Sequence, residues 1–469
     1  IRDHEIRRPG EPNYDPITLH VPQSELKKFK PLLRQYWDFK SKHFDKLVAI
    51  KVWKFYYFYY HDAIAVHKII DMKLTIWGTQ TFTFFHESCM SRFAPKLLEA
   101  GYKIAIVEQM EEIKSQDGLL QRDVCQILTR GTVIENEDLD YSSRFMLAIF
   151  DENFQFGLVF VDTTTHEFYV GEVKNHSNLK TLLMRHKPVE IVYMKDFLGQ
   201  ETLNLIKSVL GDERPVLSVM KFNEPRHLED IFKKLENYFD KENEVIYPSF
   251  LGDMRSWVNS YMMENNLGPN TKGLSLFNIE RKAPFYLVLQ AIGIAIEFFE
   301  SILLEETTIL MANFIQLNLE IEKRSLLYLD SQALKSLEVV DVPYFGGALS
   351  KKSSLFGYMD NTVSAFGKRM LKRWVMNPLL KEEAIKTRQE AVRDLLDNRE
   401  FVEFYQGKLV KLPDIERMIS RVYNLSNRKR MSAVYFEDFA QNRLKDFLVF
   451  LKELKKVEEL VESFTEFNE

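Results

Sequence analysis

The chain changes its hydrophobic periodicity near Pro284, and this change most constrains its fold. Before that residue, short apolar runs of strand character alternate with helix-like segments, a pattern typical of α/β layers. After it, apolar residues recur at helical spacing, beginning with Leu287, Ala291 and Ile294. The sequence therefore predicts a multidomain chain in which mixed α/β domains precede a mostly α-helical one.

The domain boundaries follow from length and from turn signals. A chain of 469 residues is too long for one ordinary core and suggests about three domains. Residues 1–24 form an expected extended leader, because their four prolines disfavour both helix and strand. We expect a first domain at 25–137, a second at 138–285 and a third, incomplete one at 286–469.

The composition narrows the class of protein. Cys89 and Cys125 are too few for a disulfide framework or a four-cysteine zinc site, which fits a reducing compartment. No apolar run reaches eighteen residues, so we expect no contact with a membrane. The histidines and carboxylates at 61–67 and 86–87 match no standard ligand spacing, and we predict no metal site.

Positive charge is concentrated in residues 27–54, which hold nine Lys or Arg residues against two Asp residues. The net charge of −5 does not favour a general binder of polyanions. The local excess, in contrast, suits contact with phosphates through the release of counterions. A solvated basic face without a ligand is an equally favoured interpretation.

Residues 55–60 are six consecutive aromatic residues that continue a predicted strand. Because side chains alternate along a strand, Phe55, Tyr57 and Tyr59 would share one face and the other three rings would lie behind. One face can then fill the core while the other meets a ligand. Taken alone, the run favours a buried strand whose rings fill the core.

Several segments occur in an order that identifies a family. In the third domain they are 311–314, 329–338, 360–362, 366–374 and 412–417, and in the first domain they are 101–109 and 129–132. The third-domain segments resemble the core-domain signature of the MutS family of DNA mismatch-recognition proteins. The first-domain segments resemble the later part of that family's mismatch-binding domain. Leader residues 7–9 and 18–22 are similar to the eukaryotic homologue-six branch.

The resemblance implies a mixed α/β mismatch-binding domain, an RNase H-like connector domain and the first part of a mostly helical core or lever domain. It also implies a clamp and an ATPase domain beyond Glu469. No Gly-x-x-x-x-Gly-Lys-Ser/Thr phosphate loop occurs, and the nearest stretch, 347–353, lacks the second glycine. We therefore expect neither a catalytic motif nor a cofactor in this chain. We expect ATP and Mg²⁺ to bind in the implied ATPase domain beyond Glu469.

The implied partners are double-stranded DNA with mismatches or small loops, a second MutS-family subunit and a MutL-type downstream factor. The implied location is the nucleus. The family's lever helices would transmit the state of the DNA toward the ATPase through residues 366–374. For that reason we expect interdomain packing to bury Phe366 and Trp374.

The family senses a mismatch with a Phe that wedges beside the mispaired base and a Glu two residues later, in a Gly-x-Phe-Tyr-Glu setting. Phe55 matches the wedge, and an inserted ring turns the low cost of unstacking a mispaired step into selectivity. Trp53 stands where the family has Gly, and Tyr57 stands where it has Glu. Tyr57 is the second mismatch-binding candidate, although its hydroxyl adds no charge.

Lys51, Lys54 and Arg92 are the candidate contacts to the DNA backbone, since such contacts fix register without reading bases. The stretch 81–90 matches the family poorly, with only Phe85 and Glu87 in register. Divergence from the family is thus concentrated in the recognition domain.

Two other functions remain open. A divergent paralogue that keeps the architecture but has lost mismatch sensing is consistent with Trp53 and Tyr57. An RNase H-like nuclease would need several converging carboxylates, and only Asp162 stands at a suggestive strand end.

Overall fold

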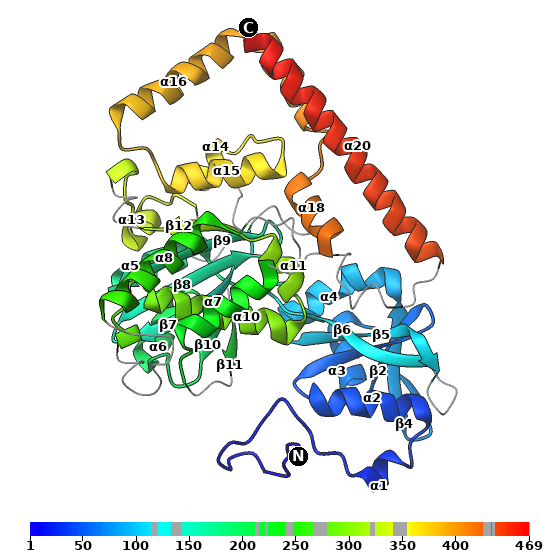
Figure 1. Ribbon diagram of the computed structural model, residues 1–469. Helices are drawn as coiled ribbons and strands as arrows, with labels where there is room; N and C mark the ends of the chain where they lie inside the picture. Colours follow the sequence, from blue (N-terminus) through cyan, green and yellow to red (C-terminus); the bar gives the residue numbers. More distant parts are fainter. Residues whose placement is uncertain are drawn as a thin grey trace. The chain divides into compact units, whose positions relative to one another are not determined.

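The computed structural model divides the chain into two compact units, whose elements are labelled in Figure 1. The first unit comprises 1–139, 299–307 and 421–445, and the second comprises 140–298, 308–420 and 446–469. The residues that the structure describes are 1–114, 120–132, 143–211, 215–220, 224–239, 247–265, 279–318, 324–340, 354–424, 433 and 437–468. The boundary expected near residue 137 and the stretch 347–353 lie outside the described residues.

The first unit is built on a six-stranded sheet in the order β3-β4-β2-β1-β5-β6. Only β1 and β5 pair in parallel, and the other neighbours are antiparallel. The strands are β1 Lys46–Val52, β2 Phe55–Tyr59, β3 Thr75–Trp77, β4 Gln80–His86, β5 Lys103–Lys114 and β6 Leu120–Leu128. The helices are α1 Gln23–Leu26, α2 Pro31–Lys42, α3 Tyr60–Ile70 and α4 Met90–Glu99, with a 3-10 turn, η1, at Glu87–Cys89. The predicted mixed α/β character is confirmed.

Alternation along the strands gives this sheet two different faces. Leu47, Tyr56 and Phe85 point to one face and form a core with residues of α3 and α4. On the opposite face, α2 packs over the strands through Tyr36, whose ring centroid lies 5.2 Å from that of Tyr59. Helices α3 and α4 therefore pack on one face of the sheet, and α2 packs on the other.

The leader contains no helix or strand before α1, as its prolines predicted. It is nevertheless held locally, because the buried carboxylate of Asp3 accepts hydrogen bonds from the backbone N–H groups of Glu5, Arg7 and Asp15. The guanidinium of Arg7 also lies 2.7 Å from that carboxylate. The segment is thus a folded turn cluster rather than a simple extended strand.

The second unit contains a six-stranded sheet in the order β11-β10-β7-β8-β9-β12. Strands β7, β8 and β9 form an antiparallel meander, and β10, β11 and β12 join it in parallel. The strands are β7 Met146–Glu152, β8 Gln155–Asp162, β9 Glu167–Lys174, β10 Glu190–Met194, β11 Val216–Met220 and β12 Asn313–Leu317. The helices around it are α5 Asn175–His186, α6 Gln200–Val209, α7 Leu228–Phe239, α8 Ser249–Glu264, α10 Tyr286–Ile302 and α11 Glu305–Leu310.

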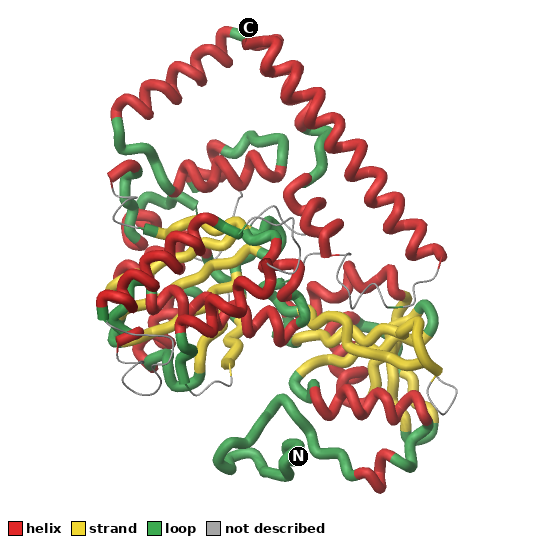
Figure 2. Tube along the Cα trace, in the orientation of Figure 1, coloured by secondary structure: helices red, strands yellow, loops and turns green. Residues whose placement is uncertain are grey.

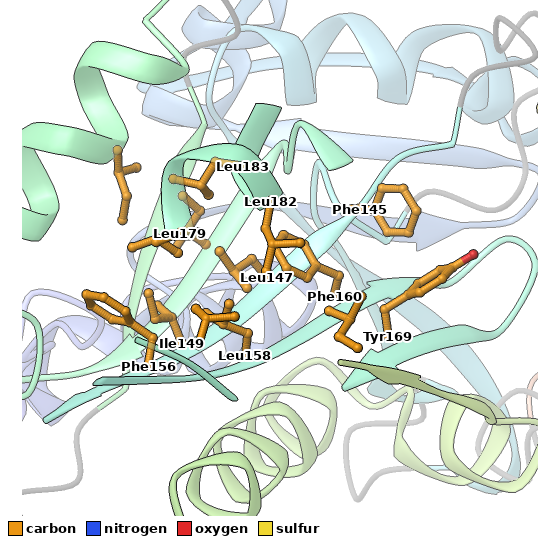
Figure 3. Close-up of a cluster of buried hydrophobic side chains, with 14 of the residues drawn as sticks. Phe145, Leu147, Ile149, Phe156, Leu158, Phe160, Tyr169, Leu179, Leu182 and Leu183 are labelled. Carbon is orange, nitrogen blue, oxygen red and sulfur yellow. The ribbon is translucent and has the colours of Figure 1, made fainter. Parts of the chain in front are cut away.

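Helices cover both faces of this sheet. Leu147, Leu158 and Phe160 meet leucines of α5 on one face, as Figure 3 shows. On the other face, α10 approaches β8 so closely that a Cβ on Gly157 would lie 1.9 Å from the backbone oxygen of Leu287. Burial on both faces explains why β8 is apolar along its length rather than alternating. The three-layer arrangement and the meander-first strand order agree with the expected RNase H-like connector.

A strand that lies beyond residue 285, the expected end of the second domain, joins the second sheet. Strand β12 pairs in parallel with β9, with Phe314 opposite Phe168. Helix α10, which falls in the expected third domain, is buried on nearly all sides, with Leu287 against Gly157 of β8 and Gly293 against Ile231 of α7. Its helical periodicity was read correctly, but periodicity does not reveal which neighbour covers a helix that is apolar all round.

The rest of the chain is helical and loop, as Figure 2 shows for its described residues. Its helices are α13 Ser331–Ser336, α14 Leu355–Met359, α15 Ala365–Met376, α16 Glu382–Asp397, α17 Arg399–Leu409, α18 Ile415–Asn424 and α20 Glu437–Asn468. The expected burial of Trp374 is wrong, because its side chain is 44% exposed and lies under the guanidinium of Arg388, 3.9 Å from the ring centroid. Phe366 is half-buried. Among the described helices, none is both long and apolar enough to cross a bilayer.

Candidate nucleic-acid interface

A tight hairpin between β1 and β2 places the predicted wedge. Val52 pairs with Phe55, so Trp53 and Lys54 alone form the turn. Trp53 has a φ of 56°, in the left-handed region that favours glycine. The resemblance expects a Gly here, and the backbone keeps the conformation that a Gly would adopt. The indole is 71% exposed, so the turn carries a large aromatic side chain at the surface.

Phe55 is the first residue of β2 and lies outside the hydrophobic core of the first unit. Its half-buried ring stands almost perpendicular to two rings of β4, at 5.5 Å from Phe84 and 5.4 Å from His86. Edge-to-face contacts of this kind hold a ring in one orientation. Phe55 is thus a braced, partly exposed ring beside an exposed turn.

The predicted alternation of the aromatic run is confirmed for residues 55–59 and is wrong for Tyr60, which begins α3 and packs against Trp37 of α2. Tyr56 and Phe58 point into the core, while Tyr57 lies on the opposite face with Phe55. The ring of Tyr57 stacks on Phe84 at 4.9 Å between centroids and 20° between planes. Burial raises the pKa of Tyr57, so the phenol stays neutral at physiological pH. The core interpretation therefore holds for the inward rings and fails for Phe55 and Tyr57.

Phe84 was missed from the sequence, because the stretch 81–90 matched the family poorly. The available signal was alternation, since Phe82, Phe84 and His86 share one face of β4 and are the cross-strand partners of Tyr59, Tyr57 and Phe55. A search for aromatic residues two positions apart on the next strand would have found them.

Lys51 was expected to contact phosphate, and this expectation is wrong. The residue is 1% exposed, and its ammonium lies 2.7 Å from Oε2 of Glu87 and 3.0 Å from Oε2 of Glu108. Tyr56 donates a hydrogen bond to the same Glu108 carboxylate. Register explains the burial, because Lys51 lies opposite Tyr56 on the inward face. The lysine neutralises two buried carboxylates instead of meeting DNA.

The basic stretch 27–54 is also less available than its composition suggests. Lys40 is buried and lies 2.7 Å from Asp62, and Lys46 is buried beside Asp45. The exposed cations of the stretch include Lys30, whose ammonium lies 5.3 Å above the ring of Trp77. A charge count along the sequence therefore overstates the basic surface.

The two other predicted backbone contacts remain at the surface. Lys54 lies half-buried in the β1–β2 turn, one residue from Phe55. Arg92 is exposed on α4 and lies over the ring of the adjacent Phe93. Both positions leave a cation within reach of solvent, as a phosphate contact requires.

The nuclease alternative depended on Asp162, which ends β8. Its side chain is fully buried and accepts hydrogen bonds from the backbone N–H and the hydroxyl of Thr164 at 2.9 and 2.6 Å. Burial raises the pKa of Asp162, while the hydrogen bonds from Thr164 and the charge of Arg417 lower it. This carboxylate ties a turn to its neighbours and is not presented to a substrate. Within the described residues, no group of three acidic, His or Cys side chains is placed to hold a metal.

Known proteins whose sequences resemble this chain include several DNA mismatch repair proteins. Msh6 of chicken (Gallus gallus), a DNA mismatch repair protein, is 27% identical over 99% of the chain. MSH6 of Arabidopsis thaliana is 29% identical over 96% of it, and human Msh6 is 27% identical over 97%. The chain spans only 37%, 36% and 36% of these three relatives, little more than a third of their length.

Three family descriptions match successive parts of the chain. Residues 30–137 match MutS domain I, residues 144–247 match MutS domain II, and residues 332–469 match MutS domain III. The sheet that carries Phe55 thus lies in domain I, and the buried Asp162 lies in domain II. With three consecutive domains in the family's order, the chain belongs to the MutS family.

Proposed function

We propose that this chain is the DNA-recognition part of a mismatch repair subunit and that Phe55 is the ring inserted beside a mispaired base. One observation carries the proposal: Phe55 lies half-buried at the start of β2, next to an exposed turn and outside the core, within the part that matches MutS domain I. The related proteins bear names that state a mismatch repair function.

Physical chemistry supports this role for Phe55. A mispaired step is easier to unstack and kink than a paired one, so a wedge inserts there at lower cost. The contacts of Phe55 with Phe84 and His86 fix the ring before DNA arrives, which reduces the entropy lost on binding. The neighbouring Tyr57 offers a neutral hydroxyl where the resemblance expects a carboxylate. Recognition by this chain therefore depends more on stacking than on a charged acceptor.

Lys54 and Arg92 are proposed to contact the DNA backbone, whereas Lys51 is excluded by its burial. We also propose a second MutS-family subunit, a MutL-type downstream factor and a nuclear location, in keeping with the eukaryotic relatives. ATP and Mg²⁺ would act in a part of the protein outside these 469 residues, because the chain has no phosphate loop.

The test compares a G·T-containing duplex with its fully paired control, using the full-length protein together with its MutS-family partner. Phe55→Ala is expected to reduce the preference for the mismatch by about 5- to 100-fold, the range for loss of one ring–base stack. Trp257→Ala is the matched control, because Trp257 is another surface aromatic, 63% exposed on α8 in the other unit. Equal binding of both duplexes by the unmodified protein would instead support the divergent paralogue.

A further inference from the structure

Three partly exposed rings form a continuous surface next to Phe55. This aromatic array consists of Tyr57 on β2 with Phe82 and Phe84 on β4. The planes of Tyr57 and Phe84 differ by 20°, and those of Phe82 and Phe84 differ by 24°. Phe84 is 37% exposed. The rings therefore lie roughly parallel and present a shared outer side, unlike the perpendicular packing of Phe55.

The array is not needed to close the core. The core rings of these strands, Tyr56, Phe58 and Phe85, point the other way, toward α3 and α4. Helix α2 meets this face at the end of β2, where its Tyr36 contacts Tyr59, and Phe84 remains exposed farther along the sheet. A sheet that keeps three large rings at its surface has an apolar patch of the kind that marks a binding site.

The charge around the array identifies the kind of ligand. Side chains that alternate onto this face of β2, β3 and β4 include no acidic residue: they are Phe55, Tyr57, Tyr59, Thr75, Trp77, Gln80, Phe82, Phe84 and His86. At the β3 edge, the ammonium of Lys30 lies over the ring of Trp77. The nearby carboxylates of Glu87 and Glu108 belong to the opposite face and pair with Lys51. Flat rings beside a cation, on a face where these strands contribute no acid, match unpaired nucleotides, whose bases stack and whose phosphates are negative.

We propose that the aromatic array of Tyr57, Phe82 and Phe84 binds unpaired DNA bases by stacking and makes extrahelical loops a preferred ligand of this chain. The inference rests on the proposed function, because Phe55 contacts Phe84 and a strand opened at Phe55 lies next to the array. Stacking reads the flat side of a base and not its hydrogen-bonding edge. Loops, whose bases are free to leave the helix, gain more from the array than a base pair that stays within it.

The experiment uses the full-length protein with its MutS-family partner and three duplexes of one flanking sequence. One duplex is fully paired, one contains a G·T pair, and one carries a short loop of unpaired thymines. A second form of the loop contains 2-aminopurine, whose fluorescence falls when the base stacks on a ring. Affinity is measured for each duplex, and quenching is measured for the labelled loop.

Phe82→Ala is expected to weaken loop binding about 5- to 100-fold and to reduce the quenching, while the preference for G·T over paired DNA changes little, because the rings that Phe82 contacts are Tyr57, Tyr59 and Phe84. Phe84→Ala is expected to weaken loop binding in the same range and also to lower the G·T preference, because its ring braces Phe55. Phe84→Tyr, which keeps the ring, is expected to retain both signals. Trp257→Ala again serves as the control for loss of a surface aromatic.

Unchanged loop affinity and quenching in both alanine variants would overturn the inference. An equal loss for all three duplexes would also overturn it, because a stacking surface for unpaired bases has no role on paired DNA. Loss of G·T preference in Phe55→Ala with normal loop binding in Phe84→Ala would leave the proposed function standing and reject the array. Normal G·T preference in Phe55→Ala together with lost loop binding in Phe84→Ala would reject Phe55 as the wedge and leave the array standing.

Discussion

Gly157 on β8 is the position where a single methyl group should most disturb the second unit. A Cβ built there would lie 1.9 Å from the backbone oxygen and 2.2 Å from the backbone carbon of Leu287, at the start of α10. Ordinary contacts begin near 3.4 Å, so the methyl group of Gly157→Ala is about 1.5 Å too close. Because the obstructing atoms are backbone, no side-chain rotation relieves the overlap.

The helix is also fixed at this end by Glu172 on β9, whose carboxylate accepts a hydrogen bond from the backbone N–H of Val288 at 3.2 Å. Moving α10 outward to admit the methyl group would stretch that bond as well as open the core. Overpacking typically costs about 1–3 kcal/mol, and a lost hydrogen bond to a charged group about 1.5–3 kcal/mol. We therefore expect Gly157→Ala to lower the free energy of unfolding of this unit by about 2.5–6 kcal/mol.

Hydrogen exchange of the α10 amides measures this stability locally, which suits a chain with two compact units. The matched control is Gly252→Ala within α8, where the nearest atom to a new Cβ lies 4.0 Å away. That substitution should be neutral or should stabilise by up to about 1 kcal/mol, because alanine favours helix. A Gly157→Ala variant with protection of α10 within about 0.5 kcal/mol of the unmodified protein would refute the steric reasoning.

Three further predictions concern charge and recognition. Burial lowers the pKa of His166 to about 4 from 6.5, so the unfolded chain takes up the proton first as pH falls. The unfolding free energy of the second unit should fall between pH 6.5 and 4. Asn tolerates the φ of 56° at this position, so His166→Asn keeps the backbone conformation. The substitution should remove about 2 kcal/mol of the stability difference between pH 7.5 and pH 5, measured by urea unfolding at the two pH values. Asp414→Asn should destabilise by about 1–3 kcal/mol, because it removes the negative charge and one of the two oxygens that accept from Arg369 at 2.7 Å. Glu416→Gln, at the exposed end of the pair, should cost under about 1 kcal/mol in the same thermal unfolding assay. Tyr57→Glu should raise the preference for G·T and weaken loop binding, and a change of both in one direction would contradict separate roles for Phe55 and the array.

Alternation within strands was predictable from the sequence, and it was more informative than the charges beside it. The same rule that separated Phe55 and Tyr57 from Tyr56 also places Lys51 on the inward face. The charge of a lysine near a candidate ligand site nevertheless suggests phosphate contact when the local sequence alone is considered. Its two carboxylate partners come from η1 and β5, and such distant pairing is not visible in local spacing. Burial of a lysine follows from the partners that the fold supplies, not from its neighbours in sequence.

Domain limits were harder to predict for a related reason. The sequence distinguishes helix from strand by period, but it does not specify which sheet a later strand will join. Strand β12 pairs with β9, although more than one hundred residues separate the two strands in the sequence. Helix α10, which lies between them in the sequence, packs on one face of the same sheet. The side-by-side position of Trp374 and Arg388 is similarly set by how α15 and α16 meet. Contacts between elements, rather than the elements themselves, were the part that local patterns could not supply.

Two of the segments that carry the family resemblance are in contact with each other in the structure. Residues 366–374 and 412–417 lie far apart in sequence, yet Arg369 of the first binds Asp414 of the second through two hydrogen bonds. The same two segments reach the β8–β9 turn. Arg373 lies 2.9 Å from the Glu167 carboxylate, and Ser420, three residues beyond the second segment, donates to the backbone oxygen of Thr164 at 2.6 Å.

The segments therefore form an electrostatic junction that attaches α15 and α18 to the end of the second sheet. Beside it, the fully buried Asp162 carboxylate lies in the field of Arg417. Partly buried charged groups of this kind are costly unless every partner is in place, so the junction has a small number of well-defined arrangements. A connection with that property suits a helical region that must keep its orientation on a rigid domain.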